Sequence, residues 1–259
     1  MHSTKYIYTF VLTMTTVVAL LLTGLYTLWK DQSKQNEAVF NKREILKSAK
    51  DYLGDGIDIE TISDEEVLTL FDGNVEQFAF DVEGNKVEEA GIVAAGYSGG
   101  KPEFIEMRKE KKKAYEDRIA PLYVFNSEGG KLYIMSVVGS GLWDDIWGNI
   151  AIKNDLTTVA GASFDHAAET PGLGAEIKDN PAFAANLKGE KIFNDEGKYT
   201  PIRVVKGGAP PSDLHAIDGI SGATVTAVGV GKMLDTGIGF FLPYITKQKG
   251  AKTKTTGMR

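Results

Sequence analysis

Small side chains and hydroxyl groups gather in residues 218–224, where the sequence reads DGISGAT. Such residues leave little bulk at a point where a turn is expected to lead into a helix. The first amides of a helix have no partner inside it and the helix dipole is positive there, so an anion is favoured. A hydroxyl there, on Thr224 or Thr226, lies next to any phosphate that the amides bind. An ordinary helix with a Ser or Thr N-cap has the same pattern, so both interpretations stay open.

Two further glycine-containing segments could bring the main chain close to a flat ligand. Residues 169–174 read ETPGLG, in which Pro171 and Gly172 favour a type II turn and the glycines permit close approach. Glu169 and Thr170 could supply hydrogen bonds to ring heteroatoms. Residues 139–143 read GSGLW, without the third glycine and following helix of a dinucleotide fingerprint. A surface turn and a hairpin bulge with core tryptophans are the alternative interpretations.

The first motif resembles the flavinylation motif of the FMN-binding domain family, in which FMN is joined through its phosphate to the final threonine. The resemblance implies a phosphoester at Thr224, made by a separate flavin transferase, with Thr226 as the rival acceptor. ETPGLG is similar to the loop that the family places against the isoalloxazine ring, and GSGLW to a segment near the flavin. By this resemblance, the residues that bind the cofactor are Thr224 (covalently), Asp218, Ser221, Gly222, Ala223, Glu169, Thr170, Leu173, Gly174, Leu142 and Trp143.

The length and an N-terminal apolar segment resemble one group within this family in particular. Its members are membrane-anchored electron-transfer subunits of sodium-translocating complexes that oxidise NADH and reduce quinone. Related subunits of Rnf-type electron-transport complexes share the anchor and the flavin motif but are usually shorter. The resemblance implies one covalent FMN, other membrane subunits as partners, and a bacterial inner-membrane location with the main domain on the extracytoplasmic side. A membrane-anchored binding or scaffold module without flavin is the competing hypothesis.

The composition restricts the chemistry that the 259 residues can carry. The chain has no cysteine, which excludes disulfides, iron–sulfur clusters and thiol nucleophiles, so an electron carrier must be an organic cofactor. The three histidines, His2, His166 and His215, are too scattered to indicate a metal site. A net charge of −6 argues against nucleic-acid binding. No acid–base pair or nucleophile has a persuasive spacing, so we predict an electron relay without catalytic residues of its own.

Residues 6–29 form an uncharged run of 24 residues. As a helix this run would span roughly 36 Å, enough to cross a hydrocarbon core of about 30 Å. Aromatic residues near both ends are typical of a membrane interface. A cleaved signal peptide would have a shorter apolar stretch followed by small residues, whereas this run ends in LYTLW. The pattern therefore favours an uncleaved anchor.

The charges that flank this anchor disagree with the location that the resemblance implies. Only Lys5 and the amino terminus precede the run, while a cluster of basic residues follows it: Lys30, Lys34, Lys42, Arg43, Lys47 and Lys50. Taken literally, the positive-inside rule keeps the large domain in the cytoplasm, although long domains translocate largely regardless of such charges. The sequence leaves the side of the membrane open.

Beyond the anchor, strand-like hairpins and segregated helices predict an α+β fold with an antiparallel sheet. Helices are expected at residues 37–53 and 223–244, a small α/β insert at 61–85, and a solvated helix or loop at the charge run 108–118. The predicted organisation is a stub at 1–5, a transmembrane helix at 6–29, a connecting helix at 30–60, a variable insert at 61–118, an FMN-binding domain at 119–246 and a basic, frayed tail at 247–259.

Overall fold

The computed structural model describes residues 3–127 and 129–256, with side chains described up to residue 250. The chain divides into two units, residues 1–42 and residues 43–259. The first two residues of the predicted stub and the last three of the predicted tail lie outside the described residues.

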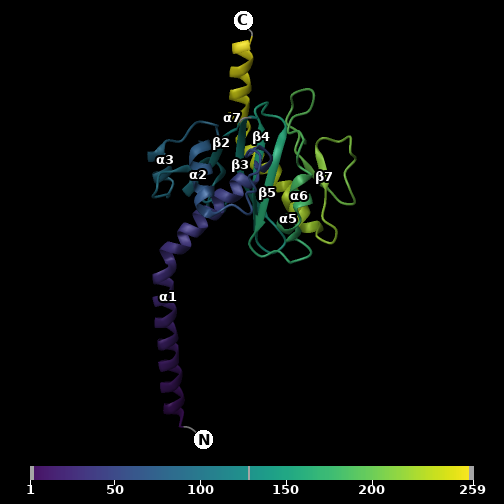
Figure 1. Cartoon of the computed structure of the whole chain (residues 1–259). Coiled ribbons are helices and arrows are strands. Elements are labelled where there is room, and N and C mark those ends of the chain that lie inside the picture. The colour runs from purple at the N-terminus through teal and green to yellow at the C-terminus, as the bar shows by residue number, and fades with distance from the viewer. Residues whose placement is uncertain (1–2, 128, 257–259) are drawn as a thin grey trace. The chain divides into compact units, whose positions relative to one another are not determined.

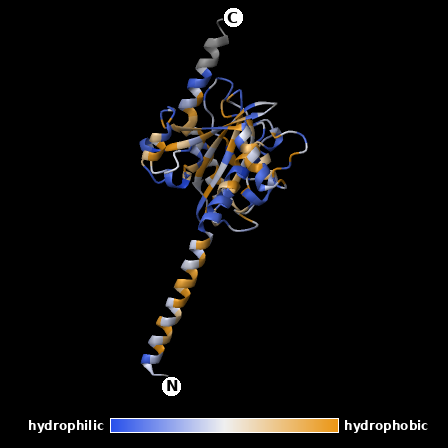
Figure 2. Cartoon of the chain, turned by 60° about the vertical axis from the view of Figure 1, so that its left-hand side comes forward, coloured by the Kyte–Doolittle hydropathy of each residue, from blue (hydrophilic) through white to orange (hydrophobic). Residues whose placement is uncertain are grey.

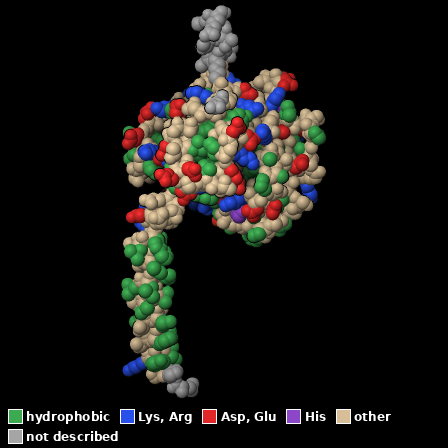
Figure 3. Space-filling view, viewed as in Figure 1, with side chains coloured by type: hydrophobic (Ala, Val, Ile, Leu, Met, Phe, Trp, Pro, Cys, Tyr) green, Lys and Arg blue, Asp and Glu red, His purple; other side chains and the backbone are tan. Residues whose placement is uncertain are grey.

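The N-terminal unit is part of one long helix, α1 (Thr4–Lys47). It joins the predicted transmembrane run to most of the second predicted helix without a break, and a short 3₁₀ turn, η1 (Lys50–Tyr52), follows. The apolar window of α1 has a mean hydropathy of 1.9 and no buried residue, and its surface is mostly hydrophobic (Figures 2 and 3). The hydroxyls of Thr9, Thr15 and Thr27 each donate a hydrogen bond to the carbonyl four residues earlier in this helix. Such bonds satisfy polar groups where a lipid environment offers no water. The helix is therefore consistent with a single-pass membrane anchor.

The second unit is built on a five-stranded antiparallel sheet, which confirms the predicted α+β class. Its strands follow chain order in space: β1 (Val75–Asp81), β2 (Ile119–Ser127), β3 (Gly130–Ser140), β4 (Asp145–Lys153) and β5 (Val159–His166). A separate two-stranded parallel sheet is formed by β6 (Arg203–Val205) and β7 (Ala216–Asp218), and β7 is seen to the right of β5 in Figure 1. Short helices complete the unit: α2 (Asp64–Asn74), α3 (Glu89–Ala94), α4 (Met107–Glu110), α5 (Glu176–Asp179), α6 (Pro181–Ala185), and the 3₁₀ turns η2 (Pro102–Phe104) and η3 (Tyr115–Asp117).

The segment that was predicted to be an insert contributes an edge strand to this sheet. Ser63 and Glu66 form a capping box at the start of α2. The helix leads directly into β1, which pairs with β2 along seven residues. Residues 75–81 thus belong to the same sheet as β2 to β5.

The charge run at residues 108–118 is mostly solvent-exposed, as the sequence predicted, but Glu110 within it is buried. The Glu110 side chain is only 1% exposed, because its carboxylate accepts hydrogen bonds from the Tyr97 hydroxyl and the Ile119 amide and pairs with Lys113. A buried carboxylate persists only with such compensation. The run therefore packs against the sheet, and Glu110 fixes it there.

Helix α7 (Thr224–Thr256) crosses one face of the sheet and packs on β3 (Figure 1). The predicted helix at 223–244 is confirmed but continues past Tyr244, so the expected frayed tail is helical up to Thr256. Glycines permit the close packing: a Cβ on Gly229 would lie 2.3 Å from the Ser140 carbonyl oxygen, and one on Gly237 would lie 2.4 Å from Val137. The apolar core lies between α7 and the sheet.

We expect Gly229→Ala to lower the free energy of unfolding by about 1–3 kcal/mol, because the added methyl group meets a backbone oxygen. Gly239→Ala is the matched control, since a Cβ there has no atom within 4 Å. Alanine favours a helix over glycine, so this control should gain about 0.5–1 kcal/mol. Denaturant unfolding of the extramembrane unit measures both, and equal effects would contradict the packing argument.

Candidate functional site

The predicted acceptor Thr224 is the first residue of α7, and its side chain is exposed. The preceding turn has a positive φ of 79° at Gly222, which glycine adopts readily. The next residue, Ala223, offers no side-chain oxygen to cap the helix. Among the described residues, no hydrogen bond starts from the main-chain amides of residues 224–226. These amides and the positive end of the helix dipole are therefore available to an anion at Thr224.

The rival hydroxyl of Thr226 lies in a different environment. Its side chain is 1% exposed, and its hydroxyl donates a hydrogen bond of 2.5 Å to Oε2 of Glu169. Two residues farther along a helix place this side chain on the opposite side from Thr224. The geometry thus favours Thr224 over Thr226 as an accessible nucleophile.

Glu169, which is predicted from the sequence to hydrogen-bond the ring, lies inside the protein. It is 5% exposed and accepts from the Thr226 hydroxyl and, at 3.0 Å, from the Trp143 amide. Gly141 and Gly174 make room for it, since a Cβ on either would lie within 2.4 Å of its oxygens. Burial alone would raise the pKa of the Glu169 carboxyl, but hydrogen bonds from Thr226, Trp143 and Leu142 outweigh it and lower the pKa. Glu169 therefore joins both glycine-containing loops to α7.

Three other residues that are predicted to contact the ring have exposed side chains near Glu169. Leu142, Trp143 and Leu173 are large apolar side chains that are 52%, 68% and 42% exposed. The Trp143 indole donates to the Thr170 hydroxyl at 3.2 Å, so the two loops meet there. Leu173 also approaches the turn before α7, because a Cβ on Gly222 would lie 2.9 Å from its side chain. The structure thus gathers these residues near the acceptor turn.

Asp218 and Ser221 lie in the exposed turn before the acceptor. Oδ1 of Asp218 accepts a hydrogen bond of 2.7 Å from the Ala209 amide. Asp218 ends β7, so this bond ties the loop between β6 and β7 to the start of the turn. In this structure the Asp218 carboxylate therefore contacts the loop between β6 and β7.

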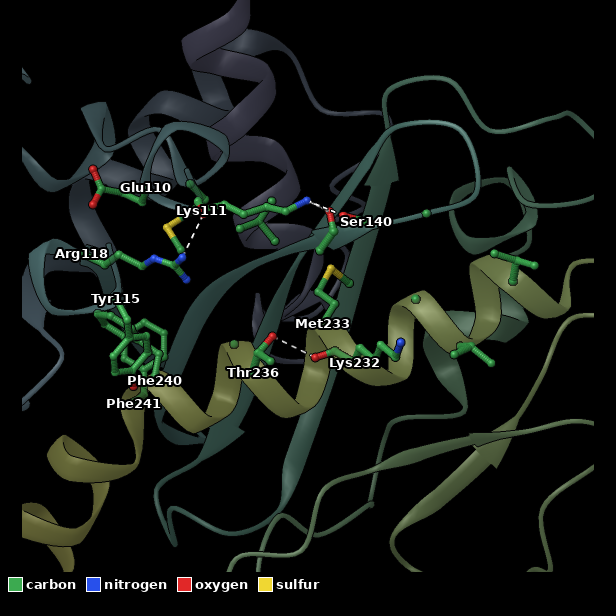
Figure 4. Close-up of a pocket in the computed structure, with 18 of the residues that line it drawn as sticks. Glu110, Lys111, Tyr115, Arg118, Ser140, Lys232, Met233, Thr236, Phe240 and Phe241 are labelled. Atoms are coloured by element: carbon green, nitrogen blue, oxygen red, sulfur yellow. Dashed lines mark hydrogen bonds between the residues drawn. The ribbon is translucent and has the colours of Figure 1, made fainter. Parts of the chain in front are cut away.

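A cavity of about 700 Å³ extends along α7 from Thr224 toward Phe241 (Figure 4). Its volume lies in the usual range for small-molecule sites. Aromatic rings of Tyr115, Phe240 and Phe241 gather at one end in Figure 4. The lining comes from four parts of the fold: Met107, Glu110, Lys111, Tyr115, Arg118 and Ile119; Val138, Gly139 and Ser140; Gly141; and one side of α7.

The sequence did not indicate that residues 107–119 form a wall of this cavity. Their charges have the composition of a solvated helix, and the fold alone brings Lys111 and Arg118 into the lining of the cavity that Thr224 also lines. No group of three or more His, Cys, Asp or Glu side chains in the described part of the chain could hold a metal ion. The site is suited to an organic anion with a flat, apolar body.

Comparison with known proteins supports this assignment of the ligand. Residues 141–239 match the FMN-binding domain family. That stretch includes the GLW and ETPGLG segments and the acceptor turn, whereas the wall at residues 107–119 lies outside it.

Longer matches, to the NqrC subunits of Na(+)-translocating NADH-quinone reductases, cover most of the chain. It is 34% identical over 232 residues to the Vibrio campbellii protein, covering 84% of this chain and 85% of that protein. It is 30% identical over 236 residues to the Pseudomonas aeruginosa protein, covering 86% and 87%. The crystal structure of the Parabacteroides distasonis protein has a TM-score of 0.70 at 32% identity and covers 84% of this chain and 96% of that one.

Proposed function

Because the chain belongs to the NqrC family of the Na(+)-translocating NADH-quinone reductases, we propose that it relays electrons through one FMN esterified to Thr224. The family membership makes it a subunit of a larger complex, with an FMN-binding domain and an N-terminal apolar helix. FMN supplies one- and two-electron transfer, which the side chains of this cysteine-free chain cannot provide. Other subunits of the complex are its partners.

The observation that carries the proposal is the contrast between the two threonines at the start of α7. Thr224 is exposed beside free amides, while the Thr226 hydroxyl is buried against Glu169. A phosphate on Thr224 would meet the amides of residues 224–226 and act as the missing N-terminal cap. The acceptor turn thus fits a phosphoester better than it fits an ordinary helix start.

The remaining proposed contacts have separate tasks. The cavity beside Thr224, together with Leu142, Trp143 and Leu173 at the surface, offers apolar area from which the ring excludes water. Gly141 and Gly174 lie against Glu169, which holds the two loops in place. Asp218, Ser221, Gly222 and Ala223 form the turn that a separate flavin transferase would recognise.

The test is covalent flavin on the full chain produced with a flavin transferase. We expect an ultraviolet-fluorescent band after denaturing electrophoresis, and an intact mass equal to the chain plus FMN less one water. A non-fluorescent band with the mass of the bare chain would overturn the proposal and favour the binding or scaffold module. Co-purification with other subunits tests the relay role separately.

We further propose that the domain lies on the extracytoplasmic side of the inner membrane, opposite to the literal count of flanking charges. Long domains translocate largely regardless of those charges, so the count does not oppose this placement strongly. Protease added to intact spheroplasts should digest the domain while a cytoplasmic marker stays whole. Complete protection of the domain, with digestion only after lysis, would place it in the cytoplasm.

A further inference from the structure

Along β3, the pairing with β4 continues farther toward the flavin loops than the pairing with β2 does. The β2–β3 register ends at the pair Leu122–Met135, so within the described sheet residues 136–140 of β3 pair with β4 alone. An unpaired strand edge leaves main-chain acceptors that need another donor. Lys111 lies along this edge, and its ammonium donates to the Gly139 carbonyl at 3.0 Å.

The same ammonium makes two more bonds at the end of the strand. It donates to the Ser140 hydroxyl and to Oδ1 of Asp145, both at 2.6 Å (Figure 4 shows Lys111 directed at Ser140). An ammonium has three donors, so all three are used on the turn between β3 and β4. That turn carries Gly141, Leu142 and Trp143. Lys111 therefore holds it from one side, while Glu169 holds it from the other through the Trp143 amide.

Lys111 is itself fixed on both sides. The neighbouring Glu110 is buried and bonded to the Ile119 amide, which anchors the segment to β2. The Arg118 guanidinium donates to the carbonyl of Lys111 at 2.9 Å and to that of Lys113 at 3.0 Å, which closes the loop on itself. A side chain held in this way loses little further entropy when it binds, as a positioning residue requires.

The charge of Lys111 is balanced by Asp145, whose carboxylate also accepts from Arg108 at 3.0 Å. Burial alone would raise the pKa of Asp145, but the hydrogen bonds from Lys111 and Arg108 outweigh it and lower the pKa. Lys111 and Asp145 thus form an ion pair, and Lys111 lines the cavity that Thr224 also lines. Removing Asp145 leaves the Lys111 ammonium without its carboxylate, whereas removing Lys111 leaves Asp145 paired with Arg108 alone.

From these contacts, we propose that Lys111, paired with Asp145, is a positioning residue that fixes the 139–145 turn against the flavin and balances the charge beside it. The proposal rests on the covalent FMN at Thr224. It assigns a role in the flavin site to a segment outside the matched FMN-binding domain.

The test uses the full-length flavinylated chain with Lys111→Met, Asp145→Asn and the double variant. Reduction adds negative charge to a flavin, so the loss of a positive charge in Lys111→Met should lower its midpoint potential, and the loss of a negative charge in Asp145→Asn should raise it. The double variant should return toward the wild-type potential. In the assembled complex, Lys111→Met should lower turnover about tenfold through displacement of the turn, with an unchanged KM for NADH.

Lys109→Met is the matched control, because Lys109 lies in α4, two residues before Lys111 at the C-cap of that helix, and pairs with the exposed Glu106. Shifts of opposite sign for the two single variants support the proposal, since a purely structural loss would shift both in one direction. Potentials and turnover equal to those of Lys109→Met would overturn it. Should Lys111→Met not fold, the sign of the change in midpoint potential in Asp145→Asn decides.

The covalent flavin content of each protein is measured first. Absence of flavin from every protein would overturn the proposed function as well. Equal midpoint potentials in flavin-labelled proteins would overturn only this inference.

Discussion

Thr224→Val should abolish covalent flavin while leaving the fold intact. Valine keeps the branched shape of threonine but has no hydroxyl, so the phosphoester cannot form. The side chain is exposed, and surface substitutions of this kind usually change stability by less than about 0.5 kcal/mol. The expected result is a protein with an unchanged unfolding midpoint, no fluorescent band and the mass of the bare chain.

Thr226→Val is the matched control for this result, since it makes the same chemical change two residues away. It removes the hydroxyl that donates to Glu169, so we expect a loss of about 1–3 kcal/mol in stability with the flavin retained. The two variants should thus separate cleanly, one losing the cofactor and the other losing stability. Loss of the label in Thr226→Val with retention in Thr224→Val would show that the acceptor assignment is wrong.

Glu169→Ala should cause the largest loss of stability among these substitutions. It leaves the buried Thr226 hydroxyl without its acceptor, together with the amides of Trp143 and Leu142. Unsatisfied buried groups cost about 1–3 kcal/mol each, so a total near 3 kcal/mol is a conservative expectation. For a unit of this size, that loss corresponds to a fall in Tm of roughly 6–12 °C. Because both loops lose their connection to α7, the flavin spectrum should change as well.

Glu169→Gln distinguishes the charge from the hydrogen bonds. Its amide oxygen can accept from the Trp143 amide while its NH₂ group donates to the Thr226 hydroxyl, so most of the bonding should survive. Thermal unfolding should place this variant much closer to the wild type than Glu169→Ala. Equal destabilisation by the two substitutions would mean that the negative charge itself, and not the bond pattern, holds the loops.

The pH dependence follows from the lowered pKa of Glu169. A carboxyl whose pKa is lower in the folded state contributes stability that is fully present above its ordinary value of 4.5 and is lost as the pH falls through the lowered value. The wild type should therefore lose more stability than Glu169→Gln between neutral pH and acid. Parallel stability curves for the two proteins over this range would contradict the assignment.

The sequence determined the features that depend on local chemistry. The apolar run of residues 6–29 requires a helix, the alternating apolar runs from residue 121 onward require a sheet, and Ser63 with Glu66 marks the start of a helix. The acceptor turn was also readable, because glycine, alanine and threonine in that order allow a tight turn into a helix. These patterns involve residues close together in the chain, so they can be interpreted without knowledge of the fold.

Only the tertiary structure decided which polar groups hold the loops of the proposed flavin site. Glu169 and Thr226 are 57 residues apart, and the fold makes a buried hydrogen bond of them. Lys111 stands in a charge run typical of a solvated surface, but the β2–β3 pairing stops at Met135, and the Lys111 ammonium bonds to the Gly139 carbonyl farther along β3. The physical reason is the same in both cases. A side chain's role depends on which donors and acceptors the packed backbone leaves unpaired near it, and local sequence does not contain that information.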